Sequence, residues 1–227
     1  ARLKVIGAHL LQCDPEGVEL RGGEILGSGA SVSVAEVART AHIRQDLLPD
    51  TVDPTLEETA VYEPEITSGV FSYSTHAAVV SVDPETGEIR IENYAVAEDC
   101  GTVVNPMIVD GQIYGGVAQG VGTALYEEIP YDEYGQPQAS TFADYHWPGP
   151  TSVPSFKISH IVTPATGTEY GMKGMGEGGA IAPPAAIANA VRDALLSAGI
   201  DAEIAETPMS PRRIFTAIQE ARNLVSQ

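Results

Sequence analysis

One acidic side chain lies inside a run of glycines, an arrangement that suits a catalytic base. The segment 171–179 is rich in glycine and contains Lys173 and Glu177. Its spacing matches the dinucleotide-binding pattern G-x-G-x-x-G, but no apolar strand precedes it and both charged residues lie inside the turn, so we reject that interpretation. A carboxylate in a low-dielectric pocket is a stronger base than one in water. Glu177 is therefore a candidate general base, and the alternative is a solvated loop glutamate.

A second candidate site is the turn over residues 99–106, with the sequence Asp-Cys-Gly-Thr-Val-Val-Asn-Pro. It leads from a predicted strand into a predicted helix, where free backbone N–H groups and the helix dipole attract anions. Asn105 followed by Pro106 is typical of an N-cap and the first helical position. The functional interpretation is a cradle for phosphate or pyrophosphate, and the alternative is an ordinary capped turn.

The helix predicted over residues 106–127 carries a third candidate site. Gln112, Gly116 and Gln119 are spaced i, i+4 and i+7 and share one face. Each interior glycine costs up to ~1 kcal/mol relative to alanine, so something must pack closely against this helix. Two glutamines beside a glycine groove suit a flat polar ligand, because each amide both donates and accepts hydrogen bonds. The alternative is close packing of another helix or a sheet, with the glutamines in water.

Hairpins and helices are the elements predicted to position these segments. Strand-like runs over 77–82 and 89–97 flank a turn that contains Pro84 and Gly87, which is typical of a hairpin. A further strand is predicted over 156–162, and helices are predicted from Pro183 to about Ser197 and from Pro211 onward. Strands followed by helices, with hairpins rather than crossovers, predict an α+β fold of antiparallel hairpins packed with helices.

The first part of the chain has a different pattern. It opens at Ala1 with a strand-like run, continues with two short strands over 18–26, and has helical spacing over 31–41. The acidic, proline-bearing stretch over 46–65 has no clear period and is typical of a surface connection. We therefore predict two domains, an N-terminal segment over 1–66 and an α+β domain over 67–227.

The charge balance excludes several classes of function. The 227 residues include 12 Lys and Arg against 31 Asp and Glu, for a formal net charge of -19. So acidic a surface repels nucleic acids and anionic membranes, and no apolar run approaches the ~20 residues of a spanning helix. Cys13 and Cys100 make no disulfide framework, and no Cys/His spacing is typical of zinc. We expect no side-chain metal site, a cytoplasmic location and, since Met is absent at the start, a fragment or a processed chain.

The candidate segments form an ordered set. They are Asp99-Cys100-Gly101, Asn105-Pro106, Gly111-Gln112, Gln119-Gly120-x-Gly122, Glu127-Glu128 and Lys173-Gly174-x-Gly176-Glu177. This set resembles the C-terminal part of the molybdopterin-binding large subunit of the xanthine dehydrogenase, aldehyde oxidase and aerobic carbon monoxide dehydrogenase family. The likeness runs from about Phe71 to Ala221. It implies an oxidoreductase domain that hydroxylates an electron-poor carbon of an aldehyde, an N-heterocycle such as a purine, or carbon monoxide, using water.

The resemblance also implies roles for single residues. In that family the dithiolene of molybdopterin, often in its cytosine dinucleotide form, holds the molybdenum in place of side chains. Glu177 matches the active-site glutamate that acts as the base, and Gln112 matches the amide that hydrogen-bonds the cofactor near the metal. The resemblance places Gly101, Thr102 and Asn105 beside the pterin or its phosphates. It assigns a supporting role in the cofactor pocket to Gln119, Gly120, Lys173 and Gly176.

Partners follow from the same resemblance. Full subunits of this family are several times longer, and their N-terminal half supplies other cofactor contacts and most of the pocket for the small-molecule substrate. Iron–sulfur clusters and FAD are then expected only on partner subunits. We expect the chain to be inactive without these partners, and its association into a homo-oligomer is left open. The alternative function is a non-catalytic domain, isolated or diverged, that acts as an assembly or interaction module.

Overall fold

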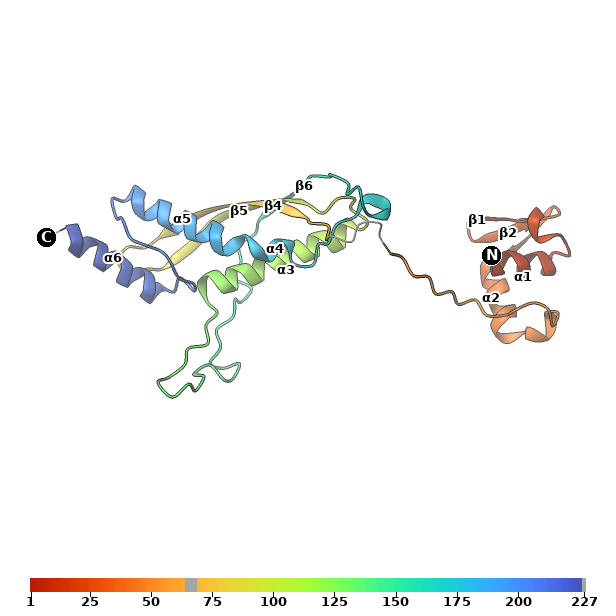
Figure 1. Cartoon of the computed structure of the whole chain (residues 1–227), viewed down its shortest axis with the longest axis horizontal. Helices are drawn as coiled ribbons and strands as arrows, with labels where there is room; N and C mark the ends of the chain where they lie inside the picture. Colours follow the sequence, from red (N-terminus) through yellow and green to blue (C-terminus); the bar gives the residue numbers. More distant parts are fainter. Residues whose placement is uncertain (64–68, 226–227) are drawn as a thin grey trace. The chain divides into compact units, whose positions relative to one another are not determined.

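The computed structural model describes residues 1–63 and 69–225. The chain forms two compact units, Ala1–Glu63 and Pro64–Gln227, and Figure 1 shows the elements of each. The domain boundary predicted between residues 66 and 67 lies outside the described residues. Within the described part, no helix combines the length and the apolar character needed to cross a bilayer.

The first unit is a small sheet with two helices. Helix α1 (Arg2–Leu10) precedes the antiparallel strands β1 (Glu19–Arg21), β2 (Glu24–Gly27) and β3 (Ala30–Ser33), and helix α2 (Val34–Ile43) follows them. Single 3-10 turns lie at Pro15–Gly17 and Gln45–Leu47. A small core joins both helices to the sheet and consists of Ile6, Ala8, Val18, Ile25, Val37 and Ala41.

Two expectations for this unit are wrong. The opening run is a helix rather than a strand, because Leu3, Gly7 and Leu10 recur at helical spacing, and a methyl group at Gly7 would lie 2.6 Å from Ile25. Helical structure does not begin at Ser31, since strand β3 continues to Ser33. The Ser33 hydroxyl then accepts a hydrogen bond from the Glu36 N–H at 3.1 Å and caps α2.

The second unit is built on a three-stranded sheet. Strands β4 (Tyr73–Val82) and β5 (Ile89–Asp99) form the predicted hairpin, with Tyr73 opposite Asp99 and an irregularity between Val79 and Val80. Strand β6 (Lys157–His160) pairs with β5 in parallel, with Glu98 in register with His160. The α+β class is confirmed, but β6 enters by a crossover rather than a hairpin because α3 and a long loop separate it from β5.

Helices cover one face of this sheet. They are α3 (Pro106–Leu125), the single turn α4 (Gly178–Ile181), α5 (Pro183–Ser197) and α6 (Pro211–Val225). Figure 1 shows α3 and α5 running along the sheet and the connection over 126–156 extending away from it. Side chains such as Val96, Ile113, Val117, Ile187 and Ile218 form one core that fixes α3 and α5 relative to β5.

Candidate functional site

The turn after β5 and the glycine loop, which are far apart in the sequence, are joined by backbone hydrogen bonds. The Thr102 N–H donates to the Gly171 carbonyl at 3.1 Å, and the Lys173 N–H donates to the Cys100 carbonyl at 2.9 Å. Gly101 has φ +69°, and a methyl group there would lie 2.2 Å from the Gly171 carbonyl oxygen. Only glycine combines this backbone conformation with this close approach. The structure therefore brings two of the three predicted segments together.

A buried ion pair locks the same junction. Lys173 Nζ lies 3.0 Å from Asp99 Oδ1, and the two side chains are 7% and 0% exposed. The same Oδ1 accepts a hydrogen bond from the Gly101 N–H at 2.8 Å, and the ammonium lies 4.7 Å from the centre of the Tyr73 ring. Lys173 thus anchors the glycine loop to the end of β5.

Asp99 is ionised in spite of its burial. Desolvation alone would raise the pKa of this carboxyl. The hydroxyls of Thr163 and Tyr73, the Gly101 N–H and the Lys173 ammonium outweigh it and hold the pKa well below its ordinary range. The second oxygen, Oδ2, is buried and has no hydrogen-bond partner at bonding geometry among the described residues. The Gly101 N–H and the Lys173 ammonium both bond to Oδ1.

Glu177 lies at the tip of this anchored loop and is exposed. Its carbonyl accepts a hydrogen bond from the Ala180 N–H at 3.0 Å, and its side chain makes no capping bond to α4. The low-dielectric pocket expected around this carboxylate is not formed by the described residues. Gly174 and Gly176, on its N-terminal side, also have open space around them.

Helix α3 divides its glycines between two faces. On one face a methyl group at Gly116 would lie 2.9 Å from the backbone of Gly179 and Ala180, and one at Gly120 would lie 2.6 Å from Pro183. These glycines admit α4 and the start of α5, so the packing interpretation holds for them. Gly111 and Gly115 lie on another face and have nothing within 4 Å. Each of them lowers the stability of the helix relative to alanine, and no close contact with another described residue explains why glycine is there.

The open face of α3 also carries polar groups. Gln112 and Gln119 are exposed, and at 100° per residue both lie within a quarter turn of Gly115 on the helix surface. The predicted cap is confirmed, since Asn105 Oδ1 accepts a hydrogen bond from the Ile108 N–H at 3.3 Å and Pro106 begins the helix. Because α4 packs on α3, the Glu177 loop is fixed to the same helix that presents these amides.

Sequence reasoning missed Glu98. This residue is 1% exposed, and neither carboxyl oxygen has a hydrogen-bond partner among the described residues. Burial, with a smaller contribution from Asp99, raises its pKa, while the Ser74 hydroxyl and His160 act in the opposite direction. The alternation of Tyr94 and Val96 on the buried face of β5 is the signal that would have placed Glu98 there.

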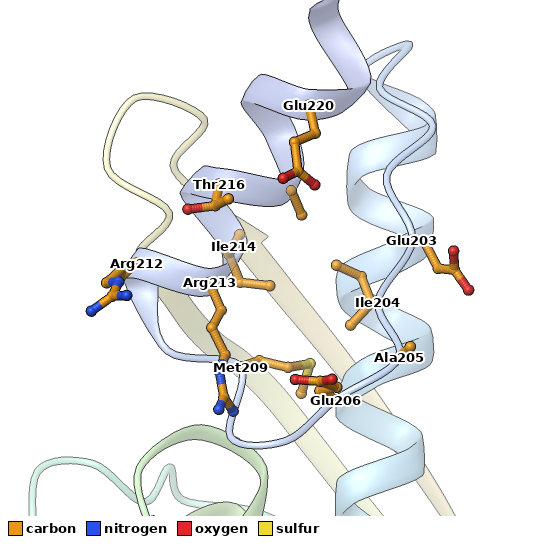
Figure 2. Close-up of a pocket in the computed structure, with 11 residues that line it drawn as sticks. Glu203, Ile204, Ala205, Glu206, Met209, Arg212, Arg213, Ile214, Thr216 and Glu220 are labelled. Carbon is orange, nitrogen blue, oxygen red and sulfur yellow. The ribbon is translucent and has the colours of Figure 1, made fainter. Parts of the chain in front are cut away.

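A cavity of about 420 Å³ lies elsewhere, between α6 and the segment over 203–206 (Figure 2). Ile204, Met209 and Ile214 contribute apolar surface to it, and none of the predicted site residues lines it. Arg213 in its wall is already committed, since it pairs with Glu128 and donates a hydrogen bond to the Pro208 carbonyl at 3.1 Å. This cavity is therefore separate from the candidate site.

Comparison with known proteins identifies the family. The sequence model of the molybdopterin cofactor-binding domain matches residues 1–154. The chain belongs to this family. The similarity covers more of the chain than the motifs indicated. The match starts at residue 1 rather than near Phe71 and therefore includes the first unit.

Individual relatives agree with this assignment. The chain is 38% identical over 219 residues to the nicotine 6-hydroxylase large subunit of Paenarthrobacter nicotinovorans, which covers 95% of the chain and 26% of that protein. It is 27% identical to the carbon monoxide dehydrogenase large chain of Hydrogenophaga pseudoflava, over 97% of the chain and 27% of that protein. The crystal structure of quinoline 2-oxidoreductase from Pseudomonas putida 86 has a TM-score of 0.74 and 40% identity, covering 96% of the chain and 28% of that chain. The molybdopterin-binding chain thus spans about a quarter of the length of these relatives.

The residues of the open α3 face fit a molybdopterin. Such a cofactor is flat, polar and anionic at its phosphate. The face offers bare backbone at Gly111 and Gly115, and the exposed amides of Gln112 and Gln119 supply both donors and acceptors. The N-terminus of the same 20-residue helix, capped by Asn105, favours negative charge.

Proposed function

We propose that this chain supplies the cofactor-facing C-terminal part of a molybdenum hydroxylase. The observation that carries this proposal is the attachment of the Glu177 loop to α3, the helix whose open face carries Gln112 and Gln119. The loop is anchored at Asp99 by Lys173, and α4 packs on α3 at Gly116. Helix α3 therefore presents the amides of Gln112 and Gln119, and the loop attached to it presents the carboxylate of Glu177.

The residues of this chain have distinct tasks in the proposed site. Gln112 and Gln119 hydrogen-bond the cofactor, with Gly111 and Gly115 permitting its close approach. Gly101, Thr102 and Asn105 face its pterin or phosphate portion, and Gly120, Lys173 and Gly176 support the loop and helix that form the pocket. When bound, the cofactor supplies the metal-centred oxidation of the substrate carbon, with the oxygen derived from water. Glu177 accepts the proton released from the attacking oxygen.

The substrate proposed is an N-heteroaromatic compound attacked at an electron-poor ring carbon. Support comes from the two relatives at 38% and 40% identity, which are named for nicotine and quinoline. Because Glu177 and Gln112 are exposed in this chain, the rest of the molybdenum subunit must cover them. Iron–sulfur and flavin subunits are the proposed route for electrons, and the chain by itself is inactive.

The decisive experiment replaces the proposed base without removing volume. In the assembled enzyme, Glu177→Gln should lower turnover of quinoline or nicotine by about 10²–10⁴-fold, because the amide cannot accept the proton. Molybdenum per chain should stay near the wild-type value, since the cofactor contacts are kept. Glu85→Gln, in the exposed turn between β4 and β5, is the matched control and should change neither quantity.

The alternative of a non-catalytic module gives a different result. Natively purified wild-type material would then contain no molybdenum and no copurifying subunits. Near-normal turnover of the Glu177→Gln enzyme would instead leave the cofactor assignment standing and overturn the role of Glu177 as the base.

A further inference from the structure

Glu98 is a buried carboxyl that none of the proposed steps uses. It lies one residue before the end of β5, on the face that also buries Tyr94 and Val96. It is 1% exposed, and its two oxygens have no hydrogen-bond partner among the described residues. A buried polar group without a partner is costly and calls for an explanation.

The carboxyl of Glu98 lies directly beneath the loop that carries Glu177. A methyl group at Gly178 would lie 2.8 Å from Glu98 Oε1 and 3.2 Å from Met175 Cε. Gly178 follows Glu177 in the chain and begins α4. Gly178 therefore packs against the Glu98 carboxyl and against Met175 of the same loop, which itself packs against the main core.

Two carboxyls at the end of β5 have opposite surroundings. Asp99 holds its charge through the hydroxyls of Thr163 and Tyr73, the Gly101 N–H and the Lys173 ammonium. Among the described residues no cation lies at bonding distance from the Glu98 carboxyl, and its neighbour in the sequence is a carboxylate. A second buried charge beside Asp99 would be repelled by the first, and burial outweighs the opposing effects of the Ser74 hydroxyl and His160 on the pKa of Glu98.

We propose that Glu98 is a positioning residue for Glu177, held as a neutral carboxylic acid whose packing under Gly178 fixes the loop. Its catalytic consequence rests on the proposed function, whereas its effect on the loop does not. Ionisation of Glu98 draws water toward the buried carboxylate and displaces Gly178, so the loop opens as the proton is lost.

The sign of the pH dependence follows from burial. Because burial raises the pKa of Glu98 in the folded chain, its contribution to loop stability is complete at low pH and is lost as pH rises through that folded value. Other titratable groups lie on the elements packed around it, so the comparison needs a variant that changes Glu98 alone. Those groups are Asp99 at the end of β5, Cys100 directly after it, His76 on β4, His160 on β6 with its partner Asp110 on α3, and Lys173 and Glu177 in the loop.

Hydrogen exchange of the peptide over residues 174–181 tests the proposal in the assembled enzyme. Wild type and Glu98→Gln, which mimics the neutral acid, are compared at each pH from 5 to 9, so that the intrinsic pH dependence of exchange cancels. We expect equal protection at the lowest pH. The wild-type rate should then rise above that of Glu98→Gln by up to about tenfold per pH unit beyond the folded pKa.

Two further variants complete the design. Glu92→Gln alters an exposed carboxylate on the same strand, bonded to Ser81 at 2.6 Å, and should behave as wild type. Glu98→Ala removes the support and should raise exchange at every pH; if it does not fold, the Glu98→Gln comparison decides. A rate ratio that does not change with pH, or faster exchange of Glu98→Gln at pH 5, would overturn the proposal.

Turnover is the second readout. In the Glu98→Gln enzyme we expect the wild-type rate at low pH and a smaller decline at high pH. A wild-type enzyme that shows the exchange effect but no hydroxylation would refute the proposed function and leave the loop mechanism intact. Full hydroxylation without the exchange effect would refute the loop mechanism and leave the proposed function intact.

Discussion

Gly115 and Gly116 are adjacent on α3 but lie on different faces of the helix. A methyl group added at one or the other therefore tests ligand approach and helix packing separately. At Gly115 a methyl group would meet nothing within 4 Å. Gly115→Ala should therefore stabilise the chain by up to ~1 kcal/mol through helix propensity. For a unit of this size that corresponds to a rise in Tm of about 2–4 °C.

The neighbouring change has the opposite sign. At Gly116 a methyl group would lie 2.9 Å from the Ala180 nitrogen and from the Gly179 carbonyl carbon and Cα, and backbone atoms cannot move aside as a flexible side chain can. Overpacking of this kind costs about 1–3 kcal/mol, which exceeds the propensity gain. Gly116→Ala should lower the Tm, and it should also loosen α4 and the loop before it.

Metal content then distinguishes a ligand face from an unused surface. If the open face of α3 holds the cofactor, the Gly115 methyl group blocks its approach, and the more stable variant should contain less molybdenum per chain. Differential scanning calorimetry of the isolated chain gives the Tm, and elemental analysis of the assembled enzyme gives the molybdenum content. A Gly115→Ala enzyme with raised Tm and full molybdenum content would refute the assignment of this face, and a lowered Tm would refute the reading of Gly115 as unpacked.

Two further changes test the junction between β5 and the loop. Lys173→Met leaves Asp99 buried without its cation and should cost about 3–5 kcal/mol in urea unfolding near neutral pH. Since the pKa of Asp99 is lowered in the folded state, this loss should shrink as pH falls through the folded value, and a loss that is constant with pH would contradict the ion pair. Gly101→Ala should cost about 2–5 kcal/mol, because φ +69° and the 2.2 Å approach to the Gly171 oxygen both penalise a methyl group. Gly135→Ala, at φ +79° with open space around it, is the control and should cost only about 1–2 kcal/mol.

Local signals in the sequence were sufficient for much of the second unit. The cap at Asn105, the hairpin turn between β4 and β5, and the start of α6 at Pro211 all arise from residues within a few positions of one another. Each of these features depends on the backbone preferences of the residues at that position, which can be predicted from their types alone. The strand predicted for the run that begins near Leu3 was wrong, because small and aliphatic residues suit a strand and a helix equally. Contact with Ile25 decides between the two.

The environment of Glu177 depended on distant residues. A pattern of glycines around one carboxylate does not specify what covers it, and the described residues leave it exposed. Burial belongs instead to Asp99 and Glu98, whose surroundings come from Lys173 and Gly178, more than 70 residues along the chain. At Gly178, the absence of a side chain makes space for Glu98.

The two carboxyls at the end of β5 bear on how any pH profile of the proposed hydroxylase is assigned. The pKa of Asp99 is held so far below the ordinary carboxyl range that this residue keeps its charge, and its bond to Lys173, wherever turnover is measured. Ionisation of Glu98 as the pH rises removes the support of Gly178 and releases the Glu177 loop. Turnover would then decline with rising pH even if Glu177 kept one protonation state throughout. Only a pH dependence that survives in the Glu98→Gln enzyme reports on the base itself. The loop thus needs one charged and one neutral carboxyl in adjacent positions, and the neutral one limits turnover as the pH rises.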